Sequence, residues 1–544
     1  MRILPSRKKP ARAVRLWACL GLLTLALLWP AAASHATFRP SDVAGLDRLH
    51  ESLRRWDAAE ARRLGEELLR QQPQDAQLLS ALSWAAFYAG EYDKALDLAE
   101  KARSISPNPE TQGQTAFVRD TVATVSPLAR VQSPHFVVRF KDPEDRVLSL
   151  YATEALEKIY ERMAREFGFA PREPVRVEIF PDTTSFQKAS TLSRKDIEVS
   201  GAVGIAKFNK IMVISPRTLL RGYRWLDALV HEYLHVLIVK LSGNYAPIWL
   251  HEGLAKYQEA RWRSEPSLYL NPLNETLLAR ALRSGAFVSF SDMEPSLVNL
   301  DTSEKIQLSY AEGASAIDYL ATRGGPGILR KLLSDIESLG EGGTRKAIEN
   351  ILETPFADFE AAWKSFLRAK GLKEIEGVGL PNYTVREGGV VDTEAQELKQ
   401  IRSLVARNHV RLGDMFVSRG QNPVAVLEYF RGLSKDPYSP YLLNKLATAL
   451  IRADRGQESI SYLEQILRTN PDYAPAYSHL GELYRQSGKL REARDAFEQV
   501  IQINPYDPRV HTRLAELYNG LGNPSRSKQE QEIADLLSSA HPGR

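Results

Sequence analysis

The stretch His231-Glu232-Tyr233-Leu234-His235 places two imidazoles and a carboxylate within five residues. It lies in the apolar run from Trp225 to Leu241, which predicts a buried helix. Residues four apart share one face of a helix, so both imidazoles could reach one metal ion. Glu232 would lie beside the open position of that metal, where it could take a proton from water. The alternative is a chance spacing of two core histidines, expected in roughly one such chain in a hundred.

A catalytic zinc site needs a third protein ligand in addition to its open position. Cys19 is the only cysteine, and it lies in the apolar run of the N-terminal leader. A chain without that leader could offer no thiolate to a metal and could form no disulfide. The ligand candidates downstream of His235 are therefore carboxylates or a histidine, and Glu252 lies 17 residues on, next to His251.

The setting of Glu252, Pro247-x-Trp249-Leu250-x-Glu252-Gly253-Leu254-Ala255, resembles the glutamate helix of gluzincin zinc metallopeptidases. This is the clan of thermolysin and the zinc aminopeptidases, and the resemblance is especially to its peptidase MA-like branch. It covers about Pro134 to Leu372 and is strongest from Asp227 to Tyr257. It favours Glu252 over the rival His251, whose side chain would point about 100° away on a helix. The resemblance implies a Zn²⁺ site with the ligands His231, His235 and Glu252 and the general base Glu232.

Tyr310 lies 58 residues beyond Glu252, within Ser309-Tyr310-Ala311-Glu312-Gly313. The related aminopeptidases carry a tyrosine at a similar distance, and its hydroxyl stabilises the tetrahedral oxyanion. The resemblance therefore implies a catalytic role for Tyr310. The alternative is a partly buried helix tyrosine, one of 21 in the chain.

Two features depart from the better known members of this clan. In the aminopeptidases a Gly-x-Met-Glu-Asn signature lies on the edge strand that lines the cleft, and its carboxylate holds the free amino group of the substrate. The corresponding run, Gly201 to Phe208, has no acidic residue, which favours an endopeptidase or another amide substrate; a plain core strand is the alternative. Thermolysin-like enzymes also place an Asp one turn after the ligand glutamate. Here that position is Lys256, and Asp227 or Glu259 could orient a ligand histidine instead.

Strands are predicted to come first in the middle of the chain and helices afterwards. From Pro247 to Leu372 the pattern is mostly helical. This order predicts an α+β domain, and the resemblance makes it a thermolysin-like metallopeptidase domain. The expected strands are His135–Phe140 and Val175–Phe180, followed by a hairpin of Gly201–Phe208 and Ile211–Ile214 with Asn209-Lys210 between them, and a helix is expected at Leu148–Phe167.

A repeat of 34 residues marks both ends of the chain. Near the C-terminus it relates Leu412, Leu446, Leu480 and Leu514, and also Pro437, Pro471 and Pro505. Near the N-terminus it relates Pro73 and Pro107. These spacings match the tetratricopeptide repeat and predict all-α solenoid segments on both sides of the middle domain. The solenoid could recruit a protein partner or substrate, or it could brace the neighbouring domain.

The first 36 residues have the layout of a secretory signal peptide. Six basic residues and no acid precede or flank an apolar run of 14 residues, Leu16 to Trp29, and A-x-A-like cleavage sites follow up to Ala36. An uncleaved membrane anchor is the alternative, although spanning needs about 20 residues. Without these residues the formal net charge falls from +4 to −2, which offers no basic surface for nucleic acid. An exported chain without disulfides fits a bacterial periplasm or cell envelope.

These patterns divide the chain into a leader, a middle domain and two helical flanks. The function they favour is an exported zinc-dependent metallopeptidase, an endopeptidase rather than an aminopeptidase, whose repeats recruit a protein substrate or partner. The alternatives are a cell-envelope scaffold with an idle peptidase domain and a purely structural zinc site, which usually has four protein ligands. The expected boundaries are a signal peptide at 1–36, N-terminal repeats at 37–112, a connector at 113–133, a peptidase domain at 134–372, a linker at 373–395 and a C-terminal solenoid at 396–540.

Overall fold

The computed structural model describes residues 40–540, apart from residues 193–201, 265, 295, 326, 381–383 and 387–392. The predicted signal peptide lies outside the described residues, as do residues 381–383 and 387–392 of the predicted linker. Among the helices that are described, none combines the length and the apolar character needed to span a membrane. The segments from residue 38 onward belong to one unit.

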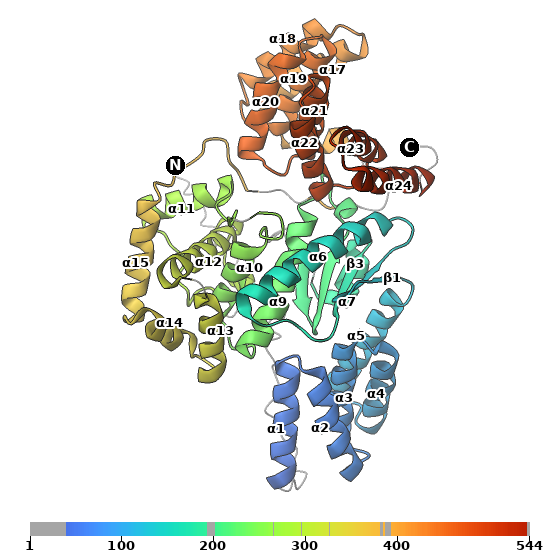
Figure 1. Cartoon of the computed structure of the whole chain (residues 1–544), viewed down its shortest axis with the longest axis vertical. Helices are drawn as coiled ribbons and strands as arrows, with labels where there is room; N and C mark the ends of the chain where they lie inside the picture. The colour runs from blue at the N-terminus through green and yellow to red at the C-terminus, as the bar shows by residue number, and fades with distance from the viewer. Residues whose placement is uncertain are drawn as a thin grey trace, which may run out of the picture. The chain divides into compact units, whose positions relative to one another are not determined.

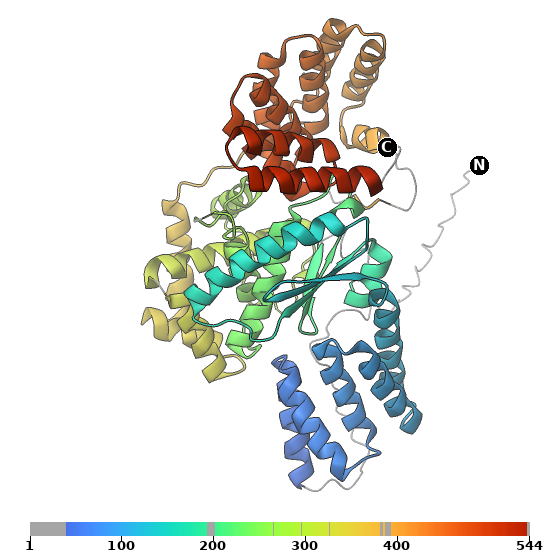
Figure 2. The same cartoon turned by 45° about the vertical axis from the view of Figure 1, so that its right-hand side comes forward.

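Five helices form the N-terminal part of the described chain (Figures 1 and 2). The Asp75 carboxylate caps α3 by accepting from the Gln77 and Leu78 amides, and Gly90 ends that helix in the left-handed conformation. The stretch 113–133, expected to be a connector, instead holds most of α5 and the strand β1. The helices are α1 (Pro40–Arg54), α2 (Ala58–Gln71), α3 (Ala76–Ala89), α4 (Tyr92–Ile105) and α5 (Pro109–Val125).

The middle domain is built on a five-stranded sheet of order β1-β2-β3-β5-β4. The three inner strands β2, β3 and β5 run parallel, and the outer strands β1 and β4 are antiparallel to their neighbours. The strands are β1 (Ala129–Gln132), β2 (Phe136–Phe140), β3 (Val175–Phe180), β4 (Gly204–Lys207) and β5 (Lys210–Ile214). The strands expected from sequence at these places are confirmed within one to three residues.

Two helices lie between the strands, and one of them was predicted. Because parallel neighbours need a crossover, α6 (Arg146–Phe167) joins β2 to β3, which confirms the helix expected at Leu148–Phe167. The helix α7 (Thr183–Ser190), which follows β3, was not predicted, and the α+β class stays a prediction. The β4–β5 turn is also shifted by one residue from the expected Asn209-Lys210. Lys207 pairs with Lys210, so the turn is Phe208-Asn209, and both residues have positive φ as a two-residue hairpin favours.

Helices make up the remainder of the middle domain. The motif helix α9 packs on α6 and on strands β4 and β5, and Gly243 ends it in the left-handed conformation. The helix α12 begins at Ser303, because the Thr302 side chain caps it. The elements are η1 (Pro216–Thr218), α9 (Trp225–Ser242), α10 (Ile248–Gln258), α11 (Pro272–Ser284), η2 (Leu297–Asn299), α12 (Ser303–Gly324), α13 (Ile328–Leu339), α14 (Thr344–Leu352) and α15 (Phe356–Ala369).

The C-terminal helices stack as successive antiparallel pairs, drawn in orange to red in Figure 1. The helix α16 precedes four such pairs, from α17–α18 to α23–α24. The 34-residue period therefore corresponds to one helix pair. The helices are α16 (Thr393–Gln400), α17 (Leu404–Ser418), α18 (Asn422–Leu433), α19 (Pro440–Arg452), α20 (Gly456–Thr469), α21 (Ala474–Gln486), α22 (Leu490–Ile503), α23 (Pro508–Gly520) and α24 (Pro524–Ala540).

Both helical flanks contact elements that carry the candidate site. In the N-terminal flank, Trp84 stacks on Phe208 of the β4–β5 turn at 5.6 Å between ring centroids, and Phe117 lies 5.2 Å from the same ring. In the C-terminal solenoid, the Ile501 carbonyl accepts a hydrogen bond of 3.0 Å from the indole of Trp225, the first residue of α9. The flanks are thus packed against the β4–β5 hairpin and the motif helix.

Candidate metal centre

Two adjacent helices supply the candidate ligands. The helix α9 carries His231 and His235 one turn apart, and α10 carries Glu252 in its first turns. A third helix, α12, fixes the position of α10. A Cβ on Gly253 would lie 2.5 Å from the backbone of Gly313, so only glycine allows the two helices to approach this closely.

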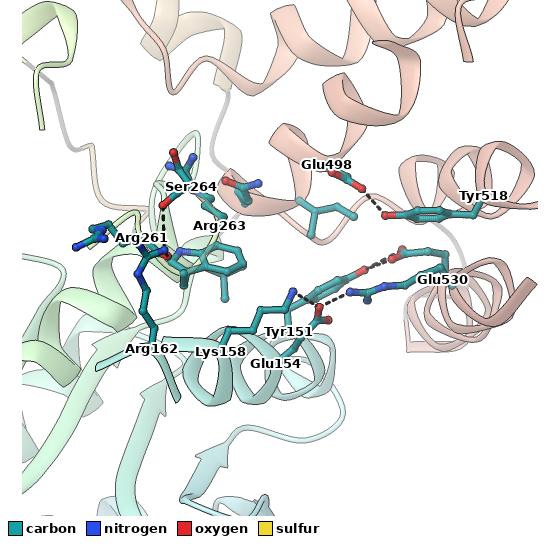
Figure 3. Close-up of a pocket in the computed structure, with 15 residues that line it drawn as sticks. Tyr151, Glu154, Lys158, Arg162, Arg261, Arg263, Ser264, Glu498, Tyr518 and Glu530 are labelled. Atoms are coloured by element: carbon teal, nitrogen blue, oxygen red, sulfur yellow. Dashed lines mark hydrogen bonds and ion pairs between the residues drawn. The ribbon is translucent and has the colours of Figure 1, made fainter. Parts of the chain in front are cut away.

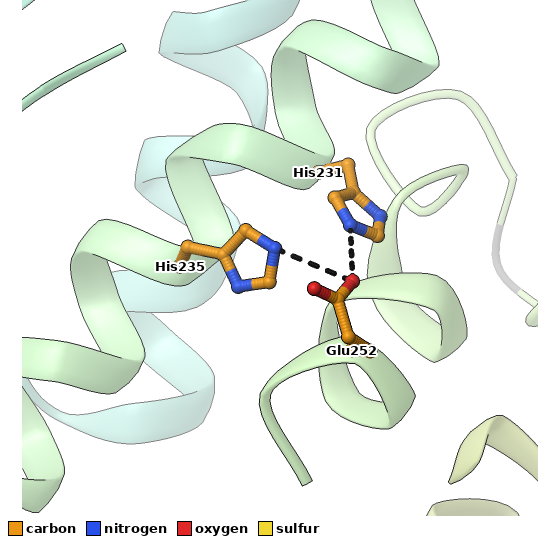
Figure 4. Close-up of side chains that lie close together, drawn as sticks. All are labelled: His231, His235 and Glu252. Atoms are coloured by element: carbon orange, nitrogen blue, oxygen red, sulfur yellow. Dashed lines mark hydrogen bonds and ion pairs between the residues drawn. The ribbon is translucent and has the colours of Figure 1, made fainter. Parts of the chain in front are cut away.

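The two imidazoles point toward one carboxylate oxygen, as Figure 4 shows. The Nε2 atom of His231 lies 3.2 Å from Oε2 of Glu252, and the Nε2 atom of His235 lies 3.6 Å from the same oxygen. The three donor atoms all lie within 4.8 Å of one another. Their side chains retain 13–19% exposure, so the cluster is sheltered but can be reached.

These distances fit a zinc ion. Tetrahedral zinc with bonds of about 2.0–2.1 Å separates its ligand atoms by roughly 3.3 Å, close to the two imidazole–carboxylate separations of 3.2 and 3.6 Å observed here. Two neutral imidazole nitrogens and a carboxylate oxygen are also a donor set that zinc accepts at catalytic sites. His231, His235 and Glu252 can therefore hold Zn²⁺ without rearrangement of the helices.

The electrostatics of the cluster favour a positive charge. Burial opposes protonation of His231, but hydrogen bonds to Glu252 and Glu259 outweigh it and raise the pKa of His231 to about 10. Burial acts against ionisation of Glu252, yet the nearby imidazoles hold its pKa well below the ordinary value. Carboxylates that stabilise a proton on an imidazole also attract a metal cation, with which that proton competes.

Glu259 orients the first ligand. Its Oε2 atom lies 3.0 Å from Nδ1 of His231, which leaves Nε2 of that ring directed at Glu252. Lys256, which replaces the Asp of thermolysin-like enzymes, holds the other oxygen of Glu259 at 2.6 Å. Asp227, the other candidate for this role, instead accepts from Arg263 and from the indole of Trp262. Both acids have a suitable spacing in the sequence, and spacing alone does not show which of them orients a ligand histidine.

Glu232 faces the edge of the sheet. A Cβ on Gly204 of β4 would lie 2.9 Å from Oε1 of Glu232, so a side chain there would displace the carboxylate. Burial raises the pKa of Glu232, while the charges of His235 and His231 and then a hydrogen bond from the Ala206 amide partly offset this effect. The predicted base thus lies against β4, the last strand of the sheet within the described residues. The contacts of Gly204 and Ala206 with Glu232 had no counterpart in the sequence analysis.

Two other candidate residues lie on α12 and α10. Tyr310 is partly buried on α12, one helical turn before Gly313, where α12 meets α10. Its catalytic role stays a prediction. His251 is buried with its ring centroid 5.6 Å from that of His235, and it does not belong to the three-residue donor cluster. Burial, followed by the nearby His235, lowers the pKa of His251 to about 3.

A separate cavity of about 460 Å³ lies between α6, the segment after α10 and helices α22 to α24 (Figure 3). Eight of its fifteen lining residues are charged, but every cation among them has a carboxylate partner. Lys158 and Arg526 pair with Glu154, Arg162 and Arg261 with Glu166, and Arg263 with Asp227. Because its charges are neutralised, this cavity competes poorly with the histidine cluster as a catalytic site.

Comparison with known protein families identifies a domain in the middle of the chain and repeats on both sides of it. Residues 152–369 match the model of the Peptidase MA superfamily, and tetratricopeptide-repeat models match residues 48–109, 438–505 and 484–530. The chain therefore contains a Peptidase MA superfamily domain flanked on both sides by tetratricopeptide repeats, which generally mediate protein–protein interactions. The prediction of this arrangement from sequence is confirmed.

The individual proteins that follow each cover less than a third of the chain. A TPR repeat-containing thioredoxin of Arabidopsis thaliana, TTL4, is 26% identical over 131 residues, which are 23% of this chain. The chain spans only 19% of the length of that relative. A crystal structure of MamA is 20% identical and covers 28% of this chain and 98% of its own, with a TM-score of 0.24. The first TPR of Spaghetti (RPAP3), bound to an HSP90 peptide, is 26% identical and covers 22% of this chain and 95% of its own, with a TM-score of 0.22.

Proposed function

We propose that the chain is an exported zinc-dependent endopeptidase of the gluzincin type, whose repeats recruit a protein substrate or partner. The observation that carries the proposal is the convergence of His231, His235 and Glu252 beside the buried carboxyl of Glu232. His231, His235 and Glu252 would hold the zinc ion. When bound, zinc supplies a Lewis acid that polarises a carbonyl and lowers the pKa of water.

The remaining chemistry belongs to residues of the chain. Glu232 takes a proton from the attacking water and passes it to the nitrogen of the leaving amine. Burial raises the pKa of this carboxyl, which favours the step in which Glu232 holds the proton before donating it. Tyr310 donates a hydrogen bond to the oxyanion that forms on the substrate carbonyl.

The edge strand β4 positions the substrate. An extended peptide can add to a sheet edge through main-chain hydrogen bonds, which places its carbonyl groups at regular intervals past the neighbouring site. The residues of β4, Gly204 to Lys207, include no carboxylate that would hold a free amino terminus. This supports cleavage within a polypeptide rather than removal of its first residue.

Zinc analysis and the Glu232→Gln variant test the proposal. The wild-type protein should contain one zinc per chain and cleave peptides whose two termini are blocked. Glu232→Gln should keep the zinc and lose about 10²–10⁴-fold in kcat, the usual contribution of a general base. Glu341→Gln, which changes an exposed glutamate, is the matched control and should cleave normally.

Three results would contradict the proposal: a protein without zinc, equal cleavage by wild type and Glu232→Gln, or cleavage restricted to free amino termini. Stable partners together with no cleavage by either protein would favour the scaffold alternative. Comparing the proteomes of wild-type and Glu232→Gln cells would identify the substrates. Export is tested by the mass of the mature protein, which should begin after Ala33 or Ala36.

A further inference from the structure

The helix α10, which supplies the candidate carboxylate ligand, begins without a cap of its own. An α-helix leaves its first four amide groups without an acceptor inside the helix. In α10 the amides of Leu250 and His251 both donate to the Pro247 carbonyl at 3.0 Å. Pro247 occupies the N-cap position and makes no side-chain cap. An acceptor for the Ile248 and Trp249 amides therefore has to come from another segment or from solvent.

Glu294 provides that acceptor from a distant part of the chain. It lies between α11 and α12, in residues 285–302, which we call the α11–α12 segment. Its Oε1 atom accepts a hydrogen bond of 2.6 Å from the Ile248 amide, and its carboxylate also interacts with the Trp249 amide. Both amides that the helix leaves over are thus served by one side chain.

The α11–α12 segment is anchored on both sides of this contact. The ring of Phe290 lies against that of Trp249, with 4.3 Å between the centroids. Two residues earlier, the Val288 amide donates a hydrogen bond of 3.1 Å to the buried Glu312 of α12. Contacts with both α10 and α12 therefore hold the segment where Glu294 can reach the N-terminus of α10.

Glu252 lies between two restraints on α10. It follows Ile248 by four residues, so in a regular helix its amide donates to the Ile248 carbonyl, one turn back. On the other side, Gly253 lies against the backbone of Gly313. A metal site needs its ligand atoms held within about 0.5 Å of the productive geometry. Loosening the first turn of α10 would disturb the 3.2 Å separation between Glu252 and His231.

We propose that Glu294 is a positioning residue of the candidate metal centre, which holds the first turn of α10 and so keeps Glu252 in place to bind zinc. Glu294 does not belong to the donor cluster, so it acts through the helix and not on the metal. The inference rests on the proposed zinc site and extends it to the α11–α12 segment, which the sequence analysis did not connect with the ligands.

Glu349 makes the same kind of contact at a helix that carries no candidate ligand. The helix α15 also has a proline at its N-cap, Pro355, and no cap from that side chain. Oε1 of Glu349 accepts a hydrogen bond of 3.2 Å from the amide of Phe356, the first residue of α15. Glu349→Ala is therefore a matched control, since it removes a cap of the same type away from the metal centre.

The zinc affinity of the full chain, measured by chelator competition, tests the proposal. Glu294→Ala should weaken zinc binding by about 10-fold, the lower end of the loss expected when an outer support of a ligand is removed. Glu294→Gln, whose amide oxygen can still accept, should stay within about 3-fold of the wild type. Glu349→Ala should lower the unfolding midpoint about as much as Glu294→Ala does and leave the zinc affinity unchanged.

Hydrogen exchange of the apoprotein gives a second measurement that does not depend on zinc. Because Glu294 is exposed, its replacement by alanine leaves no cavity in the core. The amides of residues 248–252 should then exchange faster than in the wild type, while α15 keeps its protection. Equal zinc affinities of wild type and Glu294→Ala, an equal loss in Glu349→Ala, or unchanged exchange in α10 would overturn the proposal. A wild type that binds no zinc would contradict the proposed function and this inference together.

Discussion

Two buried clusters in this protein are made of the same residue types. One is the candidate metal centre of His231, His235 and Glu252. The other lies at the contact of α6 with the solenoid, where Nδ1 of His511 is 2.8 Å from Glu530 and Nε2 is 2.8 Å from the Pro505 carbonyl. The side chains of His511 and Glu530 are 0% and 3% exposed, respectively.

The clusters differ in whether their donor atoms converge on one point and in whether a ligand can reach them. At His511 each ring nitrogen has its own acceptor and the site is closed, so the hydrogen bonds hold two segments together. At the metal centre two imidazoles converge on one carboxylate oxygen, and the three side chains keep some exposure. Buried titratable groups alone therefore do not identify a reactive site; donor atoms that converge where a ligand can enter do so.

The largest expected effect comes from removing the third ligand. Glu252→Gln should abolish zinc retention after dialysis and lower zinc affinity by more than about 100-fold, because loss of an outer residue alone costs about 10–100-fold. His251→Ala should keep the metal, since His251 lies outside the donor cluster. Zinc content measured by mass spectrometry distinguishes them, and the opposite pattern would move the ligand to His251.

The closed cluster should respond through stability instead. His511→Ala leaves the Glu530 carboxylate buried with the Tyr151 hydroxyl as its remaining side-chain donor among the described residues. Breaking a buried pair in this way costs about 3 kcal/mol, and the thermal unfolding midpoint should fall by roughly 5 °C or more. Zinc content should not change. His409→Ala removes a more exposed His–Glu pair and should cost at most about 1 kcal/mol of stability. Equal losses of stability in the two variants would show that the His511–Glu530 pair contributes no more than an exposed pair.

A smaller effect is expected at the residue that orients His231. Glu259→Gln should weaken zinc binding by about 10–100-fold, because a neutral amide oxygen accepts more weakly than the carboxylate that fixes the tautomer of the imidazole. Asp227→Asn is the matched control, since Asp227 pairs with Arg263 and not with a ligand. Competition with a fluorescent chelator measures both affinities. Equal affinities for the Glu259→Gln variant and the wild type would show that Glu259 does not support the centre.

The smallest effect concerns Glu312, a buried carboxyl outside both clusters. It accepts a hydrogen bond of 3.1 Å from the Val288 amide, and burial raises its pKa well above 4.5. A group of this kind stabilises the folded state fully below its unfolded pKa of about 4.3, and the contribution is lost as pH rises through the folded value. Glu312→Gln should therefore be more stable than wild type at pH 8, by on the order of 1 kcal/mol, and should not be so at pH 4 to 5. The measurement is the unfolding midpoint of the wild type and of Glu312→Gln between pH 4 and pH 8. Midpoints that change equally with pH in the two proteins would show that Glu312 is ionised in the folded state.

What the sequence predicts well is local. The one-turn spacing of His231 and His235, the glycine that ends α9 and the 34-residue period all depend on helix geometry, which neighbouring residues determine. The parallel order of the inner strands, the choice of Glu259 over Asp227 and the contact of Gly204 with Glu232 depend on segments distant in the chain. Hydrophobic periodicity says which face is buried but not which element covers it, so these contacts could not be predicted.

The contacts of Phe208 and Trp225 show which repeats cannot be separated from the middle domain without loss of packing. Phe208 lies one residue after β4, whose Gly204 touches Glu232, and Trp225 lies six residues before His231. Each helical flank thus contributes packing to an element of the candidate metal centre. Grafting the middle domain onto foreign repeats, or evolving new repeats by duplication, would need to preserve these two aromatic anchors, whereas repeats distant from them are free to diverge with the molecules they bind.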